Sequence, residues 1–169
     1  TIQKLLEDKK IKFNGSSSLV SKLCMDKWET NEVIEQAEIK GVSVAKHALF
    51  KIRDVPKNID DKVKKAHYDM LVSRLGTKTI IAKPRGDGCS AGVVRLFNQK
   101  DLSTYISAIK HKVLTIEPHT FTNQINSVDM PEGEVQDIIF ESFVETDKLK
   151  ASGDKITHTR KSGYVEMTV

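Results

Sequence analysis

The sequence predicts an α+β fold in which helices flank an antiparallel sheet. Segments with one apolar helical face alternate along the chain with short segments rich in β-branched residues, which are typical of strands. Two of the strand-like segments, 77–82 and 92–98, enclose a glycine-rich stretch between them. Helical segments and strand segments in one chain of this length are typical of the α+β class.

Composition limits the classes of protein that the chain can belong to. Its 169 residues suffice for one domain, or for one domain with pieces of its neighbours. A hydrophobic content of 38% and a charged content of 30% fit a globular protein, and the net charge of +4 favours anionic ligands without specifying one. There is no basic run interleaved with aromatic residues and no apolar run of about 20 residues, so we expect neither nucleic acid nor a membrane as a partner.

The cysteines and the N-terminal residues bear on the compartment. Cys24 and Cys89 lie far apart and form no C-x-x-C pair, which argues against a disulfide framework or a zinc site and favours a reducing compartment. The N-terminal sequence TIQKLLEDKK lacks the apolar region of a signal peptide. We therefore expect a cytoplasmic protein. Because the chain starts without Met and stops in a strand-like segment, we also expect it to be a piece of a longer protein.

The expected elements follow from periodicity and from turn residues. Helices are predicted at 2–6, from 19 to 28, from a cap at Thr30 to a stop at Gly41, at 60–75 and at 101–112. Strands are predicted at 11–13, 42–52, 77–82, 92–98 and 135–144, with the start of another at 164–169. The polar stretch 147–162 is expected to be irregular, and 113–135 is ambiguous.

The most informative stretch is Lys83–Gly92, with the sequence KPRGDGCSAG. Gly86, Gly88 and Gly92 allow positive φ angles and let backbone amides approach a ligand closely. Successive amides in such a loop form a concavity that binds anions, and Lys83 at the end of a strand adds a point charge. The stretch therefore predicts contact with phosphates.

Other interpretations of this loop require a different pattern or a different element after it. The P-loop pattern G-x-x-x-x-G-K-[ST] is absent. Gly86-x-Gly88-x-x-Ala91 matches the dinucleotide fingerprint, but that fingerprint opens a helix, whereas Val93, Val94, Leu96 and Phe97 favour a strand. Strand, glycine loop and strand is the arrangement of a flap over a triphosphate, as in kinases. Taken alone, the loop fits equally well a flexible hairpin that binds no ligand.

Two weaker signals lie elsewhere. The segment Ile138–Glu145, IIFESFVE, is an apolar strand followed by acidic residues, which can mark a hinge where backbone groups meet adenine. The segment Met25–Trp28, MDKW, places Lys27 on a helix, where a single lysine is normally solvated.

In combination, four segments resemble the D-alanine–D-alanine ligase family. They are NGSSSLVSKLCMDKWET, KPRGDGCSAGVVR, IIFESFVE and YVEMTV, in that order, and TIQKLLEDKKIKFNG is also similar to a stretch of that family. The resemblance covers 1–55, 79–97, 136–145 and 163–169, and it is poor over 113–135 and 146–162. It implies part of an ATP-grasp fold: residues 1–25 end an N-terminal domain, 26–162 form the central ATP-grasp subdomain with insertions near 113–135 and 146–162, and 163–169 begin a C-terminal subdomain.

The resemblance also implies roles for particular residues. Lys27, Lys83 and the flap residues Gly86, Gly88 and Ser90 would meet the phosphates of ATP. Adenine would lie against the hinge, formed by Glu141, Ser142, Phe143 and Val144, and Glu166 would reach the ribose. In that family ATP phosphorylates the carboxylate of one D-alanine, and the amine of a second D-alanine attacks the acyl phosphate, in a step of peptidoglycan synthesis. Mg²⁺ bridges the phosphates, but its ligands in the family, an Asp and an E-x-N motif, would lie outside this chain. No metal ligands are therefore expected here, and we do not expect the chain alone to catalyse ligation.

Two positions depart from the family pattern. Cys89 stands where the family usually has the first Ser of a pair, so Cys89 and Ser90 are the candidate catalytic residues near the amino-acid substrates. Asn31 stands where the family often has Lys, and we interpret it as surface variation. The alternatives are another ATP-grasp carboxylate–amine ligase, a degenerate nucleotide-binding relative or a non-enzymatic binding module. The expected partners are ATP, small amino acids and, for the full-length protein, a second copy in a homodimer.

Overall fold

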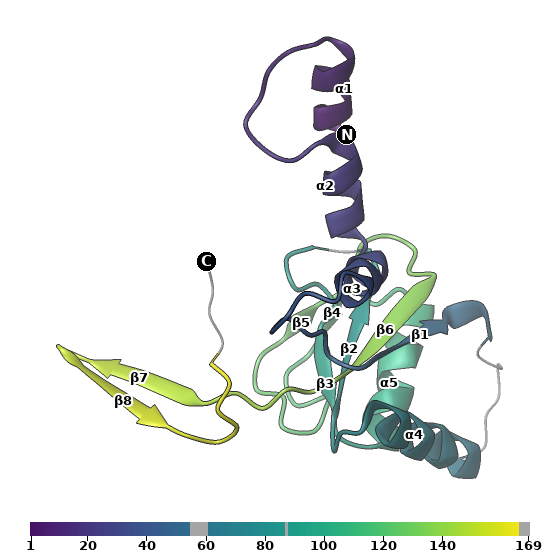
Figure 1. The fold of residues 1–169 in the computed structure, drawn as a ribbon. Coiled ribbons are helices and arrows are strands. Elements are labelled where there is room, and N and C mark those ends of the chain that lie inside the picture. Colours follow the sequence, from purple (N-terminus) through teal and green to yellow (C-terminus); the bar gives the residue numbers. More distant parts are fainter. Residues whose placement is uncertain (55–60, 87, 166–169) are drawn as a thin grey trace.

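A four-stranded antiparallel sheet forms the centre of the molecule, for which a computed structural model describes residues 1–54, 61–86 and 88–165 (Figure 1). Its strand order is β1 (His47–Lys51), β6 (Asp137–Ser142), β2 (Ile80–Pro84) and β3 (Val94–Leu96). All three pairings are antiparallel. The predicted α+β class with an antiparallel sheet is thus confirmed. Within the described residues, no helix is long and apolar enough to cross a membrane.

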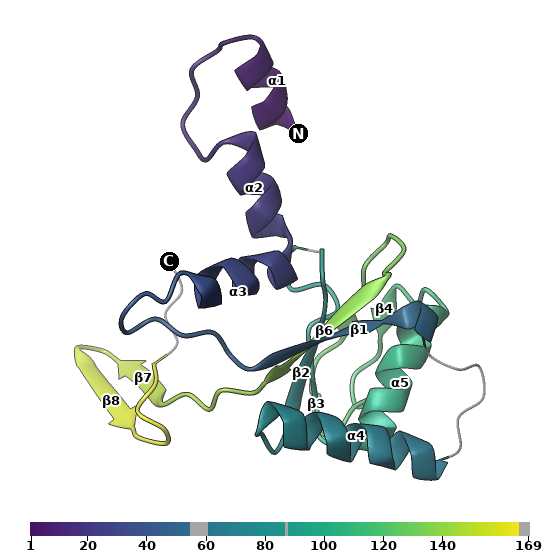
Figure 2. The same ribbon diagram turned by 45° about the vertical axis from the view of Figure 1, so that its right-hand side comes forward.

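One face of the sheet is covered by α4 (Asp61–Leu75) and α5 (Gln99–Lys110) (Figure 2). Side chains alternate across a strand, so every second residue of the central strand, Ile138 and Phe140, points toward these helices. The strand residues and the helix residues form one apolar core: Ala48, Ile80, Ala82, Val94, Leu96, Ile138 and Phe140 from the sheet, and Tyr68, Leu71, Leu75, Leu102, Tyr105, Ala108 and Ile109 from the helices. The predicted helix at 60–75 is confirmed over its described part, 61–75, with Gly76 at φ +62° just after its end.

Three helices precede the sheet: α1 (Ile2–Asp8), α2 (Ser18–Met25) and α3 (Lys27–Gln36). The prediction of one helical stripe from Val20 to Trp28 is wrong, because Asp26 adopts an extended conformation between α2 and α3. Its carboxylate accepts hydrogen bonds from the amides of Trp28 and Glu29 and so caps α3. The predicted cap at Thr30 is wrong for the same reason: Thr30 lies inside α3, and its hydroxyl donates to the carbonyls of Leu23 and Asp26.

Four further expectations need correction. Residues 11–13 form no strand, and β1 occupies only the end of the predicted strand at 42–52, before a 3₁₀ turn η1 (Ile52–Asp54). The stretch 147–162 is not irregular: β7 (Lys148–Ser152) and β8 (Lys155–Thr159) pair as a hairpin. Its turn is Gly153-Asp154, with Gly153 at φ +56°, which is the turn chemistry of a two-residue hairpin loop. Residues 164 and 165 are not in a strand, and 166–169 lie outside the described residues.

The β7–β8 hairpin is fixed by one carboxylate to the residues after it. Asp147 accepts hydrogen bonds from the amides of Lys161, Ser162 and Gly163 and lies 2.7 Å from Nε2 of His158. These backbone donors hold the pKa of Asp147 well below its usual range. The residues on both sides of the hairpin are thereby held together at its base.

The ambiguous stretch 113–135 supports the end of the glycine-rich loop. It contains β4 (Thr115–Ile116) and β5 (Val128–Asp129), which pair with each other. The amide of Gly92 donates to the carbonyl of Asp129 at 2.7 Å, and the hydroxyl of Tyr105 donates to the carbonyl of Gly92 at 2.7 Å. Gly92 is therefore the point at which the loop is tied to the rest of the fold.

We predict that Gly92→Ala destabilises the fold. A Cβ atom at this position would lie 2.9 Å from Cγ of Pro84 and 3.2 Å from Cδ of Pro131, and φ is +67°, a conformation that costs an L residue energy. Overpacking and backbone strain together should lower the free energy of unfolding by about 1–3 kcal/mol in urea titrations. Gly88→Ala is the matched control, because nothing lies within 4 Å of its added Cβ. Equal stability of the two variants would contradict the prediction.

Candidate functional site

The face of the sheet opposite the core carries charged side chains. Residues directly opposite each other in an antiparallel pair point to the same face. Glu141 is opposite His47 on one side and Ile81 on the other, and Ile81 is in turn opposite Arg95. Lys83 lies two residues after Ile81 on the same strand and so points to the same face. These residues alternate along their strands with the core residues. We call His47, Lys83, Arg95 and Glu141 the polar face. Helix α3 lies over it (Figure 2), since Asn31 and Trp28 contact two of its members.

An ion pair lies at the centre of the polar face. Nζ of Lys83 lies 2.7 Å from Oε1 of Glu141, and the two side chains are only 20% and 12% exposed. The same carboxylate oxygen accepts a hydrogen bond of 2.9 Å from Nδ2 of Asn31. The interpretation of Asn31 as surface variation is therefore wrong: α3 directs this side chain into the polar face, where it helps to hold Glu141.

Arg95 extends the polar face toward the predicted hinge. Its guanidinium carbon lies 3.4 Å from the centre of the Phe143 ring and 4.8 Å from that of Phe97, both of which are cation–π contacts. Nε donates to Oγ1 of Thr79 and Nη2 donates to Glu145. Arg95 therefore fixes the orientation of the Phe143 ring on the sheet.

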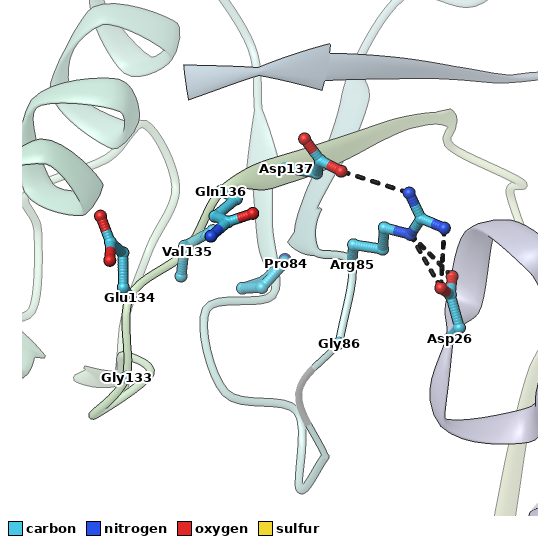
Figure 3. A pocket seen from close by; sticks show the side chains of 9 residues that line it. All are labelled: Asp26, Pro84, Arg85, Gly86, Gly133, Glu134, Val135, Gln136 and Asp137. Atoms are coloured by element: carbon cyan, nitrogen blue, oxygen red, sulfur yellow. Dashed lines mark hydrogen bonds and ion pairs between the residues drawn. The ribbon is translucent and has the colours of Figure 1, made fainter. Parts of the chain in front are cut away.

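A second charged cluster joins the start of the glycine-rich loop to α3 (Figure 3). Arg85 donates from Nε to both carboxylate oxygens of Asp26 at 2.9 Å, and it forms ion pairs with Glu29 at 3.0 Å and Asp137 at 3.2 Å. The main chain reinforces the junction, because the amide of Lys27 donates to the carbonyl of Arg85 at 3.0 Å. Lys27, the first residue of α3, is therefore held beside the loop through its backbone.

Asp26 and Arg85 stabilise the charged forms of each other. Burial raises the pKa of Asp26, but hydrogen bonds from Arg85 and from the amides of Glu29 and Trp28 outweigh it, so the net pKa lies below its usual value. The hydrogen bond to Asp26 raises the pKa of Arg85 in turn. Both groups are charged at neutral pH, which fixes the junction as an ionic contact.

A cavity of about 500 Å³ lies beside this junction. Figure 3 shows that it is lined by the start of the loop, by the residues that lead into β6 and by Asp26, which precedes α3. The lining residues are Asp26, Pro84, Arg85, Gly86, Gly133, Glu134, Val135, Gln136 and Asp137. The cavity therefore combines backbone of the glycine-rich loop with polar side chains from Asp26, Arg85 and the stretch 134–137.

The tip of the glycine-rich loop adopts left-handed backbone conformations. Cys89 and Ser90 have φ angles of 51° and 59°, and the amide of Ala91 donates to the carbonyl of Gly88. Positive φ at both central residues of a four-residue turn is the geometry of type I′, which usually selects Asn and Gly. Two side chains at such positions are uncommon and store backbone strain, and both residues are exposed.

The predicted hinge has most of its main chain committed to the sheet. The amide of Ser142 donates to the carbonyl of Lys46, and that of Phe143 donates to the carbonyl of Thr79. These bonds extend the pairings of β6 with β1 and with β2. Val144 follows them and is 45% exposed.

The predicted site residues are only partly brought together. Lys83 and Glu141 form one contact, Phe143 lies nearby under Arg95, and Lys27 lies at the junction with the loop. Gly86 lines the cavity, while Gly88, Cys89 and Ser90 occupy the exposed part of the loop. Glu166 lies outside the described residues. Sequence reasoning did not identify Arg85, Arg95, Asn31 or His47 as site residues. For Arg95 and His47 the signal was strand alternation, which places both on the face of Glu141.

The architecture and the glycine-rich loop between β2 and β3 place the fold in a known class. Solved structures of D-alanine–D-alanine ligases match this chain over most of its length. The resemblance carried by the sequence motifs is therefore confirmed at the level of the fold. No protein-family model matches the sequence, and no curated protein sequence matches it.

The particular structures have low sequence identity to the chain. The D-alanine–D-alanine ligase of Coxiella burnetii has a TM-score of 0.56 at 16% identity, covering 93% of this chain and 38% of that one. The Bacillus anthracis ligase complexed with ATP has a TM-score of 0.53 at 15% identity, covering 99% and 48%. The VanG D-Ala:D-Ser ligase of Enterococcus faecalis has a TM-score of 0.54 at 20% identity, covering 99% and 41%. The chain thus spans less than half the length of these ligases.

We predict that Arg85→Ala lowers the free energy of unfolding by about 1–3 kcal/mol, because it leaves partly buried carboxylates of Asp26 and Asp137 without their partner. The folded pKa of Asp26 is depressed, so its contribution is complete above the unfolded pKa and is lost as pH falls through the folded value. The difference between the free energies of unfolding of the variant and the wild type, measured in urea, should therefore be largest near neutral pH. It should become smaller below about pH 4.

Arg53→Ala is the control for this variant. Among the described residues Arg53 pairs with Asp54, at 3.7 Å, and both side chains are mostly exposed. Such a surface pair should contribute less than about 1 kcal/mol. A loss of stability that is the same for the two variants, or that does not depend on pH, would contradict the role given to Arg85.

Proposed function

We propose that the chain is the central ATP-binding part of an ATP-grasp ligase of the D-alanine–D-alanine ligase type. The observation that carries the proposal is the pairing of Lys83 with Glu141 on the polar face, next to a glycine-rich loop between β2 and β3. The fold shared with these ligases, one of them complexed with ATP, supports it. In the parent protein ATP would activate a D-alanine carboxylate, and the amine of a second D-alanine would attack the acyl phosphate.

Phosphate binding would require an exchange of partners at Lys83. Its ammonium group is neutralised by Glu141, so an ATP phosphate competes with that carboxylate for the same point charge. Asn31 donates to Glu141 as well, and it can go on holding the carboxylate when Lys83 turns to the phosphate. The exposed left-handed turn at Cys89 and Ser90 is where a phosphate would reach the loop, because the amides of Ala91, Gly92 and Val93 already donate to carbonyls within the fold.

The adenine contact would fall at the end of the sheet. The amides of Ser142 and Phe143 donate to the carbonyls of Lys46 and Thr79. Recognition of adenine would therefore depend on the main chain of Val144 and on the face of the Phe143 ring. Arg95 holds that ring in place. Glu141 would meet polar atoms of the nucleotide, and Glu166 would meet the ribose.

Three described carboxylates beside Lys83 and Arg85 have partners in this chain: Glu141 pairs with Lys83, and Asp26 and Asp137 pair with Arg85. These three therefore do not fit Mg²⁺ ligands. The boundaries of the central subdomain at 26 and 162, a homodimer of the full-length protein and a cytoplasmic location stay predictions.

We predict that Lys83→Ala weakens ATP binding to this chain about tenfold or more, because a charge-assisted phosphate contact contributes roughly 1.5–3 kcal/mol. Calorimetric titration with ATP measures the affinity. Lys65→Ala is the matched control, since it removes the same charge from an exposed i,i+4 pair with Asp69 on α4. Equal affinity of both variants would refute the assignment of Lys83.

We also predict that Cys89→Ser, made in the full-length ligase, retains or raises kcat/KM for ligation. A hydroxyl is a stronger hydrogen-bond donor than a thiol, and the exposed side chain has room for either. Coupled measurement of ADP release with D-alanine provides the test. A loss of more than about tenfold would assign the Cys89 thiol a role that a serine hydroxyl cannot fill.

A further inference from the structure

A cluster of possible metal ligands lies where α3 crosses the start of β1. Glu32 and Glu35 are three residues apart on α3, so their side chains share one face of the helix. His47 is the first residue of β1. One ligand atom from each of these three residues lies within 4.8 Å of the other two. The cluster involves neither Lys83 nor the glycine-rich loop.

The histidine is oriented as a metal ligand would be. Its side chain is only 6% exposed. Nδ1 lies 3.0 Å from the carbonyl oxygen of Ala45, so this nitrogen carries the hydrogen. That contact directs Nε2 toward Oε1 of Glu32, 3.0 Å away. A backbone carbonyl on one ring nitrogen is the usual arrangement that orients a histidine whose other nitrogen binds a metal.

The three ligand atoms suit a divalent ion in number and in charge. Nε2 of His47 and the carboxylates of Glu32 and Glu35 converge on one position, since these atoms lie within 4.8 Å of one another. A divalent ion at that position would balance the charges of both carboxylates.

The surroundings complete the environment of such a site. The ring of Trp28, one turn before Glu32 on α3, packs edge-on against the ring of His47 with centroids 4.8 Å apart. This contact shields one side of the imidazole, and an apolar wall of this kind is typical of the shell around a bound metal. The exposed Glu35 leaves the other side open to solvent.

We propose that Glu32, Glu35 and His47 bind a Zn²⁺ ion. One imidazole nitrogen with two carboxylate oxygens suits zinc, whereas Mg²⁺ prefers oxygen ligands alone. Three protein ligands leave a fourth position for water. The ion would join α3 to β1 and so fix the helix that places Lys27 and Asn31 over the polar face. The site does not depend on the proposed ATP function, because none of its three ligands is assigned to the nucleotide.

The only tryptophan of the chain makes a local measurement possible. Co²⁺ bound beside His47 quenches the fluorescence of Trp28, and Zn²⁺ added afterwards restores it by displacement. Iodoacetamide first blocks Cys24 and Cys89, which are free and exposed and could bind metal themselves. Calorimetry with ZnCl₂ on the same alkylated protein gives the affinity and the stoichiometry.

Two variants remove ligands and two serve as controls. Glu35→Gln and His47→Gln should each weaken Zn²⁺ binding about tenfold or more and abolish saturable Co²⁺ quenching at the wild-type midpoint. Glu38→Gln makes the same charge change just beyond α3, and His67→Gln removes a histidine from α4, and both should leave the binding unchanged. Because Glu35 is exposed, its variant reports on the site even if His47→Gln unfolds the protein. The proposal is overturned if the wild type binds no Zn²⁺, or if Glu35→Gln binds Zn²⁺ as tightly as Glu38→Gln does.

Discussion

The central position of β6 is the constraint on which the rest of the structure depends. This strand pairs with β1 on one side and β2 on the other, so its main chain is saturated and its side chains must divide between two faces. Ile138 and Phe140 go to the core, and Glu141 goes to the polar face. A shift of one residue in its pairing would place Glu141 among the core side chains and Phe140 on the polar face. The register that builds the core therefore also builds the site.

The cations of the site are neutralised by carboxylates from distant segments. Lys83 pairs with Glu141, Arg85 with Asp26, Glu29 and Asp137, and Arg95 with Glu145. Each pair holds its cation in a fixed place without leaving an uncompensated buried charge, which would be costly. An anionic ligand consequently gains only the difference between its own contact and the one it displaces. Such an exchange is least costly where a neighbour such as Asn31 can retain the displaced carboxylate.

Hydrophobic periodicity predicted the amphipathic helices and the strands at 77–82, 92–98 and 135–144. In these segments the buried residues recur with the period of the helix or strand. Periodicity did not predict the break between α2 and α3 at Asp26. The apolar stripe continues past this residue, but the Asp26 carboxylate accepts hydrogen bonds from two amides and starts a new helix there. The β7–β8 hairpin was missed because all its residues are exposed and polar alternation leaves little signal, although Gly153-Asp154 is a known turn pair. For the site, motifs identified Lys83 and Glu141. The contact of Asn31 with Glu141 follows from the placement of α3, and the place of Arg95 on the same face follows from the strand register.

The part of the chain that resembles the ligase family least is the part that shapes the cavity. Residues 113–135 supply Asp129, which holds the amide of Gly92, and Pro131, which leaves no room for a side chain there. They also provide Gly133, Glu134 and Val135 to the cavity wall beside Arg85. The pairing of Lys83 with Glu141, by contrast, joins segments that carry the sequence motifs. The contact between 113–135 and the loop therefore sets both the position of Gly92 and the lining of the space beside Arg85.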